Sequence, residues 1–493
     1  MPNFDYHALA PESILTGIAL IVLLVDLFLP RQWKWLTATL AGAGVLAALV
    51  PVLTLWVTPG PRELFGGSFV VDRFSLVLKA LFLGSSFITL LLAFRYIEDG
   101  SYKEGEFYFL LLSSVLGMLV ISSARDLITL FIAIELVSSP TYLLAGWRKT
   151  DPNSIEGALK YFLIGVLSIA VSLYGMSLIF GITGGSLRFQ TISSFFASGP
   201  PHDVAVLGAV AVVLVLVGFA FKISAVPFHF WAPDAYQGAP TPVTAFLSVA
   251  SKAAGFVGIY SLILVAFPAQ VNVWRPVIYG LAVATMTVGN LIALRQTNVV
   301  RLLAYSSIAH AGYILAPLAA IGSDGRISGL SLSASISYLF VYAVMNLGAF
   351  GAVIAIAQTT KSAEVSTWTG LVKRAPWLTL TTVFFLFSLA GVPPAAGIWA
   401  KFLVFRAIVK AGGGTNLALA AIVALNSVIA VFYYANVAKK MIFDSASSEL
   451  DATENVPVPS TVASALGILA GITLLWFILP NFVFHLGATG VFQ

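Results

Sequence analysis

Long apolar stretches recur along the whole sequence, and they restrict its possible folds more than any other feature. A helix needs about 20 apolar residues to cross the hydrocarbon core of a bilayer. Lipid offers no hydrogen-bond partner to the backbone, so such segments cross it as helices. We therefore expect an all-α integral membrane protein with about 14 transmembrane helices, numbered 1 to 14 along the chain. Their expected ranges are Ser13–Leu29, Leu36–Val57, Phe74–Phe94, Phe107–Ser122, Leu127–Trp147, Ala158–Gly181, Val204–Trp231, Pro242–Phe267, Pro276–Leu294, Leu302–Ala320, Ser331–Gln358, Leu378–Lys410, Asn416–Met441 and Val462–Phe484.

The composition agrees with a lipid environment and excludes several classes of function. Charged residues make up 10% of the chain and hydrophobic residues 59%, whereas a soluble domain carries roughly 25% charged residues. Cysteine is absent, which excludes disulfides, iron–sulfur ligation by thiolates and zinc-thiolate sites. The five histidines are scattered without the spacing of metal ligands, so we expect no metal site. The net charge of +5 is attributed to membrane topology, not to a nucleic-acid partner.

The distribution of lysine and arginine between the connecting loops predicts the orientation. Thirteen of these residues follow odd-numbered helices and seven follow even-numbered ones. Because cytoplasmic loops carry the excess of positive charge, the odd loops are placed in the cytoplasm and both termini outside. The seven residues on the outer side are Arg62, Arg73, Arg125, Arg188, Arg275, Arg326 and, at a helix edge, Lys410.

Two of the expected helices are longer than one crossing requires, and both contain prolines. Helix 7 includes Pro227 and continues to Pro233, and helix 12 includes Pro393 and Pro394. Proline lacks an N–H group and crowds the carbonyl four residues back, so each site is expected to interrupt its helix. Interrupted helices five spans apart favour two inverted five-helix repeats with functional sites near the midplane. The alternative is a pair of ordinary proline kinks in long tilted helices.

These breaks predict four parts of the chain. Residues 1–106 form an N-terminal three-helix segment. Residues 107–267 form the first repeat, helices 4 to 8 with broken helix 7. Residues 268–441 form the second repeat, helices 9 to 13 with broken helix 12. Residues 442–493 form the C-terminal loop and helix 14.

Several charged residues fall inside the expected spans, and they separate into two groups. The first group lies near helix ends, where long side chains can reach the interface; it consists of Lys79, Lys160 and Arg406. The second group lies near the middle of spans or beside the breaks; it consists of Glu135 in helix 5, Lys222 in helix 7, Lys252 in helix 8 and Lys401 in helix 12.

The second group requires a functional or structural reason. A charge at the bilayer centre costs roughly 2.5–3.5 kcal/mol on insertion scales. Structural Glu–Lys pairing cannot account for three lysines and one central carboxylate. Desolvation favours the neutral form of a lysine, so an unpaired buried lysine can gain and lose a proton near neutral pH. A proton relay is therefore preferred to static ion pairs.

Three further residues are candidates for the same relay. His310 lies in mid-span in helix 10, and its titration range suits proton transfer between Lys252 and Lys401. A buried histidine that is simply hydrogen-bonded is the alternative. His229 and Asp234 lie beside the helix 7 break and are candidates for connecting the site to water, or for capping the loop.

Five segments carry a resemblance to a known family, the antiporter-like membrane subunits of proton-pumping NADH:quinone oxidoreductase (respiratory complex I). The resemblance covers helices 2 to 12, and the stretch across helices 7 and 8 is the most specific. The segments are FIAIEL (131–136), ALKYFLIG (158–165), FKISAVPFHFWAPD (221–234), GAPTPVTAF (238–246) and AYSSIAH (304–310). A lysine on helix 8 favours the subunit N (subunit 2) branch, because larger relatives usually carry histidine there.

The resemblance implies a fold and a set of site residues. It implies fourteen helices with two inverted repeats. It also implies that Glu135 and Lys222 form an ion pair, that Lys252 is the central lysine and that Lys401 is the outer one. Separating Glu135 from Lys222 would weaken the hold of the lysine on its proton and drive the proton onward. His310 and the secondary candidates His229, Asp234 and Lys160 complete the expected set.

The resulting expectation is a proton-translocating subunit of a complex I enzyme in a bacterial inner membrane. Its partners would be other membrane and peripheral subunits, including neighbouring antiporter-like subunits, with the lipid bilayer around them and no nucleic acid. No cofactor is expected in this chain; quinone, FMN and iron–sulfur clusters belong to partner subunits. There are two alternative hypotheses. The first is a subunit of a Mrp-type sodium/proton antiporter or membrane-bound hydrogenase, and the second is a structural scaffold whose charges are static. A lipid-modifying enzyme is disfavoured because no nucleophile–base pair is evident.

Overall fold

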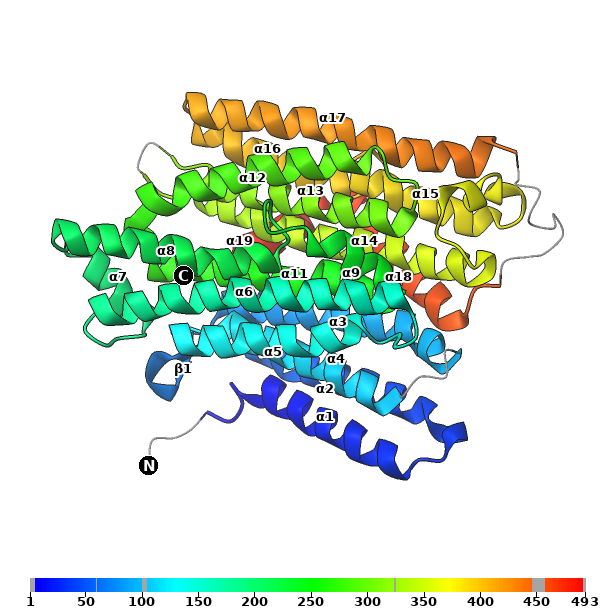
Figure 1. The fold of residues 1–493 in the computed structure, drawn as a ribbon, viewed down its shortest axis with the longest axis horizontal. Coiled ribbons are helices and arrows are strands. Elements are labelled where there is room, and N and C mark those ends of the chain that lie inside the picture. Colours follow the sequence, from blue (N-terminus) through cyan, green and yellow to red (C-terminus); the bar gives the residue numbers. More distant parts are fainter. Residues whose placement is uncertain (1–4, 59, 100–103, 323–324, 446–456, 491–493) are drawn as a thin grey trace.

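The computed structural model describes residues 5–58, 60–99, 104–322, 325–445 and 457–490, and most of them lie in long helices packed side by side (Figure 1). The α-helices are α1 (Ala10–Phe28), α2 (Trp35–Val57), α3 (Arg73–Asp99), α4 (Glu104–Ser123), α5 (Leu127–Ala145), α6 (Pro152–Ile182), α7 (Phe189–Ala197), α8 (His202–Lys222), α9 (Trp231–Gly238), α10 (Thr241–Phe246), α11 (Lys252–Ser261), α12 (Val271–Ala293), α13 (Val299–Ala319), α14 (Gly329–Thr360), α15 (Pro376–Ala390), α16 (Gly397–Ala411), α17 (Gly414–Phe443), α18 (Ser460–Ile478) and α19 (Pro480–Thr489).

Shorter elements connect or continue these helices. Two π-helical segments, η3 (Leu247–Ser251) and η4 (Leu262–Ala266), flank α11, so that α10 to η4 form one membrane crossing. The 3₁₀ turns are η1 (Arg31–Trp33), η2 (Phe65–Gly67), η5 (Pro268–Gln270), η6 (Val365–Trp368) and η7 (Leu371–Lys373). The strands β1 (Arg62–Leu64) and β2 (Phe69–Val71) pair antiparallel across η2.

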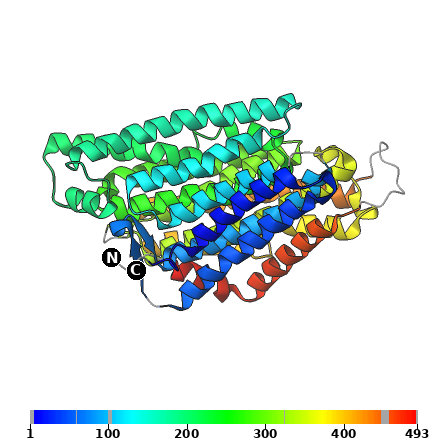
Figure 2. The ribbon, with the colours of Figure 1, turned by 90° about the horizontal axis from the view of Figure 1, so that it is seen from below.

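The number of membrane crossings agrees with the sequence. Among the described residues, 13 helical segments are long and apolar enough to cross a bilayer. The remaining crossing is divided between α15 and α16, each 15 residues long. Together they give fourteen, an even number that returns the chain to the side on which it began. Figure 2 accordingly shows that α1, in blue, begins and that α18 and α19, in red, end toward the same left-hand end of the bundle.

Both expected helix breaks are present. α8 ends at Lys222, and residues 223–230 leave the α-helical path before α9 begins. In the second repeat, α15 ends at Ala390 and the chain re-enters a helix only at Gly397. Each break contains the proline predicted to cause it, since proline removes a backbone donor and crowds the preceding turn. The fold is thus the expected one, two inverted five-helix repeats, each with a broken helix.

Glycines allow close helix contacts in α4 and in α12. A Cβ on Gly117 of α4 would lie 2.9 Å from the carbonyl oxygen of Ala133 in α5. A Cβ on Gly289 of α12 would lie 2.9 Å from the carbonyl oxygen of Tyr305 in α13. Membrane helices pack through such small residues because lipid provides no hydrophobic force to hold them together. The first two helices of each repeat therefore pack backbone to backbone.

Three features differ from the sequence interpretation. The β1–β2 hairpin and the nine-residue helix α7 were not expected, because their short segments carry no long periodic pattern. The last expected helix, Val462–Phe484, is two helices: α18 ends at Ile478 and α19 begins at Pro480, where a missing N–H interrupts the ladder. α19 packs against α14.

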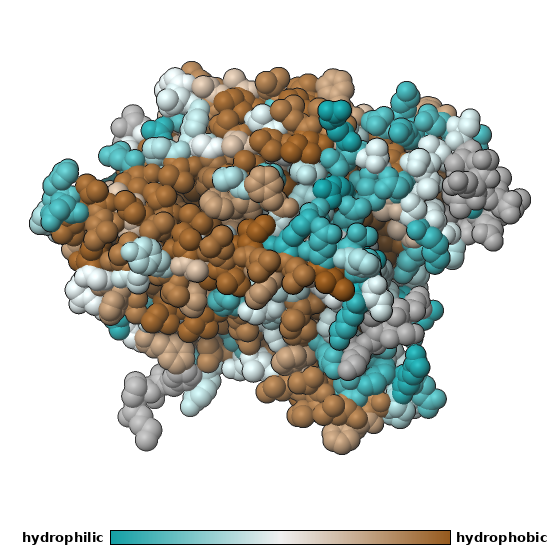
Figure 3. Space-filling model, viewed as in Figure 1, coloured by the Kyte–Doolittle hydropathy of each residue, from teal (hydrophilic) through white to brown (hydrophobic). Residues whose placement is uncertain are grey.

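The surface reflects the membrane environment. In Figure 3, hydrophobic residues cover much of the visible face along the sides of the helices, and hydrophilic residues gather toward its right-hand end. Large exposed apolar side chains occur on α1, α6 and α17, among them Leu24, Leu167 and Phe432. An apolar surface of this extent requires lipid or other membrane subunits around it.

Candidate functional site

The four basic candidates of the sequence are all buried in the protein. The exposed fraction is 2% for Lys222, 2% for Lys252, 9% for Lys401 and 1% for His310. No carboxylate of the described residues lies within 4.0 Å of any of these side chains. Static pairing with acidic residues therefore does not explain why the chain keeps them in its interior.

Lys222 is held by hydroxyl groups at the end of α8. Its Nζ donates to Ser138 Oγ and to Tyr161 Oη, each at 3.0 Å. Tyr161 also shares a 2.9 Å hydrogen bond with Thr141 Oγ1, and its ring stacks on Trp231 with the ring centroids 4.1 Å apart. Neutral hydroxyls stabilise a lysine in either protonation state, because each can accept or donate a hydrogen bond.

Glu135 does not make the direct ion pair with Lys222 that the family resemblance implies. It lies in the middle of α5, half-buried, on the same face as the exposed residues Ile132 and Ser139. Its Oε2 accepts a long hydrogen bond of 3.5 Å from Ser139, and its Oε1 is buried without a hydrogen-bond partner in the described structure. The carboxylate remains within electrostatic reach of Lys222, so the two groups interact without direct contact.

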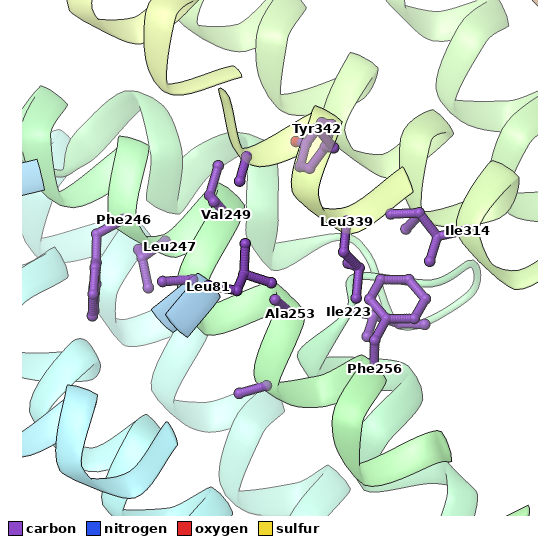
Figure 4. Packing of buried hydrophobic residues seen from close by; sticks show 14 of the residues in the cluster. Leu81, Ile223, Phe246, Leu247, Val249, Ala253, Phe256, Ile314, Leu339 and Tyr342 are labelled. Carbon is purple, nitrogen blue, oxygen red and sulfur yellow. The ribbon is translucent and has the colours of Figure 1, made fainter. Parts of the chain in front are cut away.

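Lys252 lies where the π-helical segment η3 joins α11. Its Nζ donates to the backbone oxygen of Ser307 at 2.9 Å and also to the Ser307 hydroxyl. Apolar side chains surround this segment, including Val249 and Ala253 beside it and Leu339 from α14 (Figure 4). The Lys252 ammonium is therefore desolvated except for its contacts with Ser307.

The distance between the Lys222 and Lys252 regions is short because of a glycine. A Cβ on Gly255 of α11 would lie 3.1 Å from Cβ of Lys222 and 2.7 Å from Cγ2 of Ile223. Gly255 is one turn beyond Lys252 on the same helix. The absence of a side chain at this position thus lets the end of α8 rest directly on the helix that carries the central lysine.

The helix α13 carries a stripe of polar residues from Lys252 toward Lys401. Ser307 binds Lys252, and His310 follows one turn later. The Nδ1 atom of His310 is 2.8 Å from Tyr338 Oη, and Tyr434 Oη contacts both His310 Nε2, at 3.4 Å, and Ser306 Oγ. His310 therefore lies within a hydroxyl network between two of the buried lysines.

Lys401 lies at the far end of this stripe. Its Nζ donates to the backbone oxygen of Ala390 at 2.7 Å, at the open end of α15, and lies 5.2 Å from the ring centroid of Tyr313. The ring of Tyr313 in turn is 5.8 Å from that of His310. The break in helix 12 thus supplies the carbonyl that binds the ammonium, as expected for freed backbone groups that line a protein interior.

Gly391 offers a direct test of how Lys401 is held. It has a φ of +83°, and an added Cβ would lie 2.7 Å from Cδ of Lys401. Gly391→Ala is expected to cost about 1–2 kcal/mol of stability through the left-handed backbone and also to displace Lys401 from Ala390, lowering proton transfer. The control is Gly184→Ala, in the connection after α6, where φ is +70° and an added Cβ would have no neighbour within 4 Å. Equal effects of both variants on proton pumping would contradict the positioning of Lys401 by Gly391.

Two of the secondary candidates, Lys160 and Asp234, belong to an ion-pair network near the surface, whereas the third, His229, is a buried side chain. Asp234 of α9 accepts from Lys160 at 2.6 Å and from Arg301 at 2.7 Å, and Lys160 also pairs with Glu156 at 2.6 Å. These contacts join α6, α9 and α13 near the loops that follow helices 5 and 9. His229 is 4% exposed, packs on Phe230 and has no partner for Nδ1 among the described residues.

The Asp234 network predicts a dependence of stability on pH. Burial alone would raise the pKa of Asp234, but the hydrogen bonds from Lys160 and Arg301 hold the pKa of this carboxyl below its ordinary value. A carboxyl with a lowered pKa stabilises the fold above its unfolded pKa, and that contribution disappears as the pH falls through the folded pKa. We expect the melting temperature of the Asp234→Asn variant to fall less steeply than that of the natural protein as the pH is lowered. Asp203→Asn, at an exposed carboxyl, should leave it unchanged.

One expectation about the charged residues is wrong. Lys79 does not extend to the interface; its side chain is fully buried, and Nζ lies 2.7 Å from Oε1 of Glu12 in the first turn of α1. The sequence alone could not pair two residues on helices 1 and 3, because it does not show which faces of these helices meet. Arg406 is exposed on α16.

Sequence reasoning also missed the hydroxyl residues that connect the charged ones. They had a local signal, since Ser138 lies three residues after Glu135 and Ser307 lies three before His310. Residues at these spacings share a helix face. Tyr313 had the same signal, since it lies three residues after His310 on α13. The tyrosines from other helices had none; they are Tyr161, Tyr338 and Tyr434.

Comparison with known proteins gives a consistent assignment. The family model described as "NADH:quinone oxidoreductase/Mrp antiporter, TM" matches residues 124–430. The chain is 39% identical to NADH-quinone oxidoreductase subunit N of Trichlorobacter lovleyi, over 99% of this chain and 97% of that one. It is also 39% identical to NAD(P)H-quinone oxidoreductase subunit 2 of Synechococcus elongatus, over 98% of this chain and 91% of that one.

Solved structures show the same fold. A chain of respiratory complex I from Thermus thermophilus is 32% identical, with a TM-score of 0.77, over 97% of this chain and 99% of that one. The Mrp complex from Dietzia contains a chain with a TM-score of 0.83 at 21% identity, over 99% of this chain and 97% of that one. At that identity the second likeness establishes the fold alone.

Two broken helices around buried lysines define the class of antiporter-like membrane subunits. The matched family model and the full-length relatives narrow this class. The chain belongs to the NADH:quinone oxidoreductase/Mrp antiporter family of membrane subunits and, within it, to the subunit N (subunit 2) group.

Proposed function

We propose that this chain is the proton-translocating subunit N of a complex I enzyme and moves protons from the cytoplasm outward as quinone is reduced in the same complex. The observation that carries the proposal is the row of buried basic residues that runs through the interior. Lys222, Lys252, His310 and Lys401 are buried, lack acidic partners within 4.0 Å and are joined by hydroxyl groups and close helix contacts.

Protons would reach Lys222 from the cytoplasmic side and continue laterally. Lys222 passes its proton toward Lys252 across the contact at Gly255. The hydroxyls of Tyr236 and Tyr342 are buried without hydrogen-bond partners among the described residues, and such groups can bind the water that a proton transfer needs. Ser307 and Ser306 lead from Lys252 to His310 and Tyr434. Lys401, beyond Tyr313, releases the proton outward.

Glu135 would act as the electrostatic control of Lys222. Its carboxylate attracts the ammonium without binding it directly, so a small movement of α5 changes the affinity of Lys222 for its proton. Ser138 binds Lys222 from the same helix and would move with Glu135. Approach favours the protonated lysine, and separation favours release toward Lys252.

The outward position of Glu135 also supports a protein neighbour. A carboxylate that is only half-buried in the middle of a transmembrane helix is costly against lipid. A neighbouring antiporter-like subunit that covers this face of α5 would supply polar partners. We infer that the other membrane and peripheral subunits of the complex bind FMN, iron–sulfur clusters and quinone, and that this chain carries no redox group.

The remaining assignments follow from the same proposal. The protein resides in a bacterial inner membrane with both termini on the outer side, as the bias of lysine and arginine favours. Residues 107–267 and 268–441 are the two repeats. Residues 1–106 and 442–493 flank them; of the latter part, 446–456 and 491–493 lie outside the described residues.

Purification of the tagged chain from its native membrane tests the proposal. We expect NADH dehydrogenase and iron–sulfur subunits to co-purify. When NADH and quinone are added to reconstituted vesicles, protons should accumulate on the side that corresponds to the outside of the cell. An uncoupler should abolish this proton gradient. Co-purification with small antiporter subunits instead, together with sodium-dependent proton exchange that needs no NADH, would establish the Mrp-type alternative.

A further inference from the structure

An arginine-lined cavity lies at the end of the bundle that carries the β1–β2 hairpin, away from the lysine line. Its volume is about 990 Å³. Four of the seven positive residues expected on the outer side converge on it from three connections between helices; they are Arg62, Arg73, Arg125 and Arg188. A concentration of arginine on the side that normally carries fewer positive charges is unusual and serves no step of the proton path.

Backbone contacts between three loops bring the arginines together. The backbone N–H of Arg125 donates to Ser68 at the hairpin, and that of Phe189 donates to the carbonyl of Arg125. The guanidinium of Arg188 lies across the hairpin turn, since a Cβ on Gly66 would be 2.8 Å from its Nη2. These contacts fix the loops after helices 2, 4 and 6 around one space.

Acidic side chains neutralise only part of this charge. Arg125 pairs with Asp72 at 2.7 Å, and Arg62 binds Asp5, which lowers the pKa of that carboxyl through the hydrogen bond from Arg62. Glu63 also lines the cavity. Arg73 contacts the ring of Trp56, with its guanidinium carbon 4.8 Å from the centroid. Among the described residues, neither Arg73 nor Arg188 has a carboxylate partner.

The other walls of the cavity are apolar. Leu55 at the end of α2, Leu76 in the first turn of α3 and Val265 in η4 line it. These residues lie at the ends of membrane crossings, at the level where acyl chains meet headgroups. A ligand suited to the whole cavity combines an anionic group for Arg73 and Arg188 with an apolar body.

We propose that this cavity binds the headgroup of an anionic phospholipid, with the phosphate between Arg73 and Arg188 and the glycerol and upper acyl region against Leu55 and Leu76. Arginine suits this ligand because its planar donors can hold two phosphate oxygens at once. The site would anchor the hairpin end of the protein to anionic lipid in the outer half of the membrane.

Photolabelling of the assembled complex in nanodiscs tests the proposal. The probe is a photoactivatable phosphatidylglycerol, and the labelled peptides are identified by mass spectrometry. We expect labelling of peptides that line the cavity, prevented by excess phosphatidylglycerol and not by phosphatidylcholine or inorganic phosphate. Equal competition by phosphatidylcholine would reduce the cavity to an apolar groove. Competition by inorganic phosphate would make it a site for free anions. Either result overturns the proposal without requiring any variant.

Substitutions of the two arginines provide a second, independent test of the proposal. Arg73→Gln and Arg188→Gln are each expected to lower labelling roughly fivefold, because a cationic side chain near anionic lipid contributes about that factor. The Arg→Lys variants at both positions should fall between the natural protein and the Arg→Gln variants, because lysine keeps the positive charge but not the paired donors. Lys410→Gln removes one charge from the same end of the bundle outside the cavity and should have no effect. Unchanged labelling in the Arg73→Gln/Arg188→Gln double variant would overturn the proposal.

Discussion

Assembled complexes that carry Lys222→Ala are expected to lose proton pumping and NADH:quinone turnover together, each by roughly a hundredfold, the scale on which a positioned proton-transfer group acts. The side chain of Lys222 is 2% exposed, and its Nζ contacts only the hydroxyls of Ser138 and Tyr161 among the described polar groups. Alanine leaves no group at this position that can hold a proton. Pumping is measured in membrane vesicles by quenching of a pH-sensitive dye, with assembly verified by native electrophoresis.

Lys222→Arg separates proton exchange from charge. Arginine keeps the positive charge that Glu135 attracts, but it does not release a proton in proteins. A relay therefore predicts loss of pumping in Lys222→Arg, whereas a static electrostatic role predicts near-normal pumping. Lys149→Ala, at an exposed lysine near the start of α6, is the matched control and should leave both activities unchanged. Normal pumping in Lys222→Ala would show that Lys222 is not part of the proton path and would favour the hypothesis of a structural scaffold.

The helical frame could be predicted because lipid leaves the chain few alternatives. An apolar run of about twenty residues has to satisfy its backbone internally, and the prolines at 227 and 393 mark where two helices cannot continue. The hairpin at 62–71 could not be predicted in this way. Its strands are three residues long, too short for an alternating pattern. Phe69 of the second strand also bridges to Ala124, a partner that lies beyond two further helices in the chain.

The charged members of the site could be predicted individually, but not their connections. Each buried lysine is anomalous in its own helix, so Lys222, Lys252 and Lys401 are recognisable without a fold. Tyrosines are common in membrane helices and become meaningful only when a helix from elsewhere in the chain places one beside a lysine, as α6 places Tyr161. The separation of Glu135 from Lys222 is likewise a property of helix packing that neither local sequence contains.

The ion pair between Glu12 and Lys79 carries the second large prediction. The two side chains are 7% and 0% exposed, and their charged atoms lie 2.7 Å apart between α1 and α3. Removing one partner leaves an uncompensated buried charge, so Lys79→Met or Glu12→Leu alone is expected to cost about 3–5 kcal/mol. Both variants should lower the temperature at which the assembled complex dissociates.

The double variant Glu12→Leu/Lys79→Met decides what the pair is for. Replacing both charges with apolar side chains of similar size is commonly neutral or stabilising, so the double variant should regain the thermal stability of the natural protein. Normal pumping in that variant would make the pair a structural clamp of α1 on α3, consistent with its absence from the line that Lys222, Lys252 and Lys401 define. Lost pumping in a fully stable double variant would instead extend the proton path to α1. Such a result would require a connection from Lys79 to Lys252 through α3, which packs against both η3 and α10.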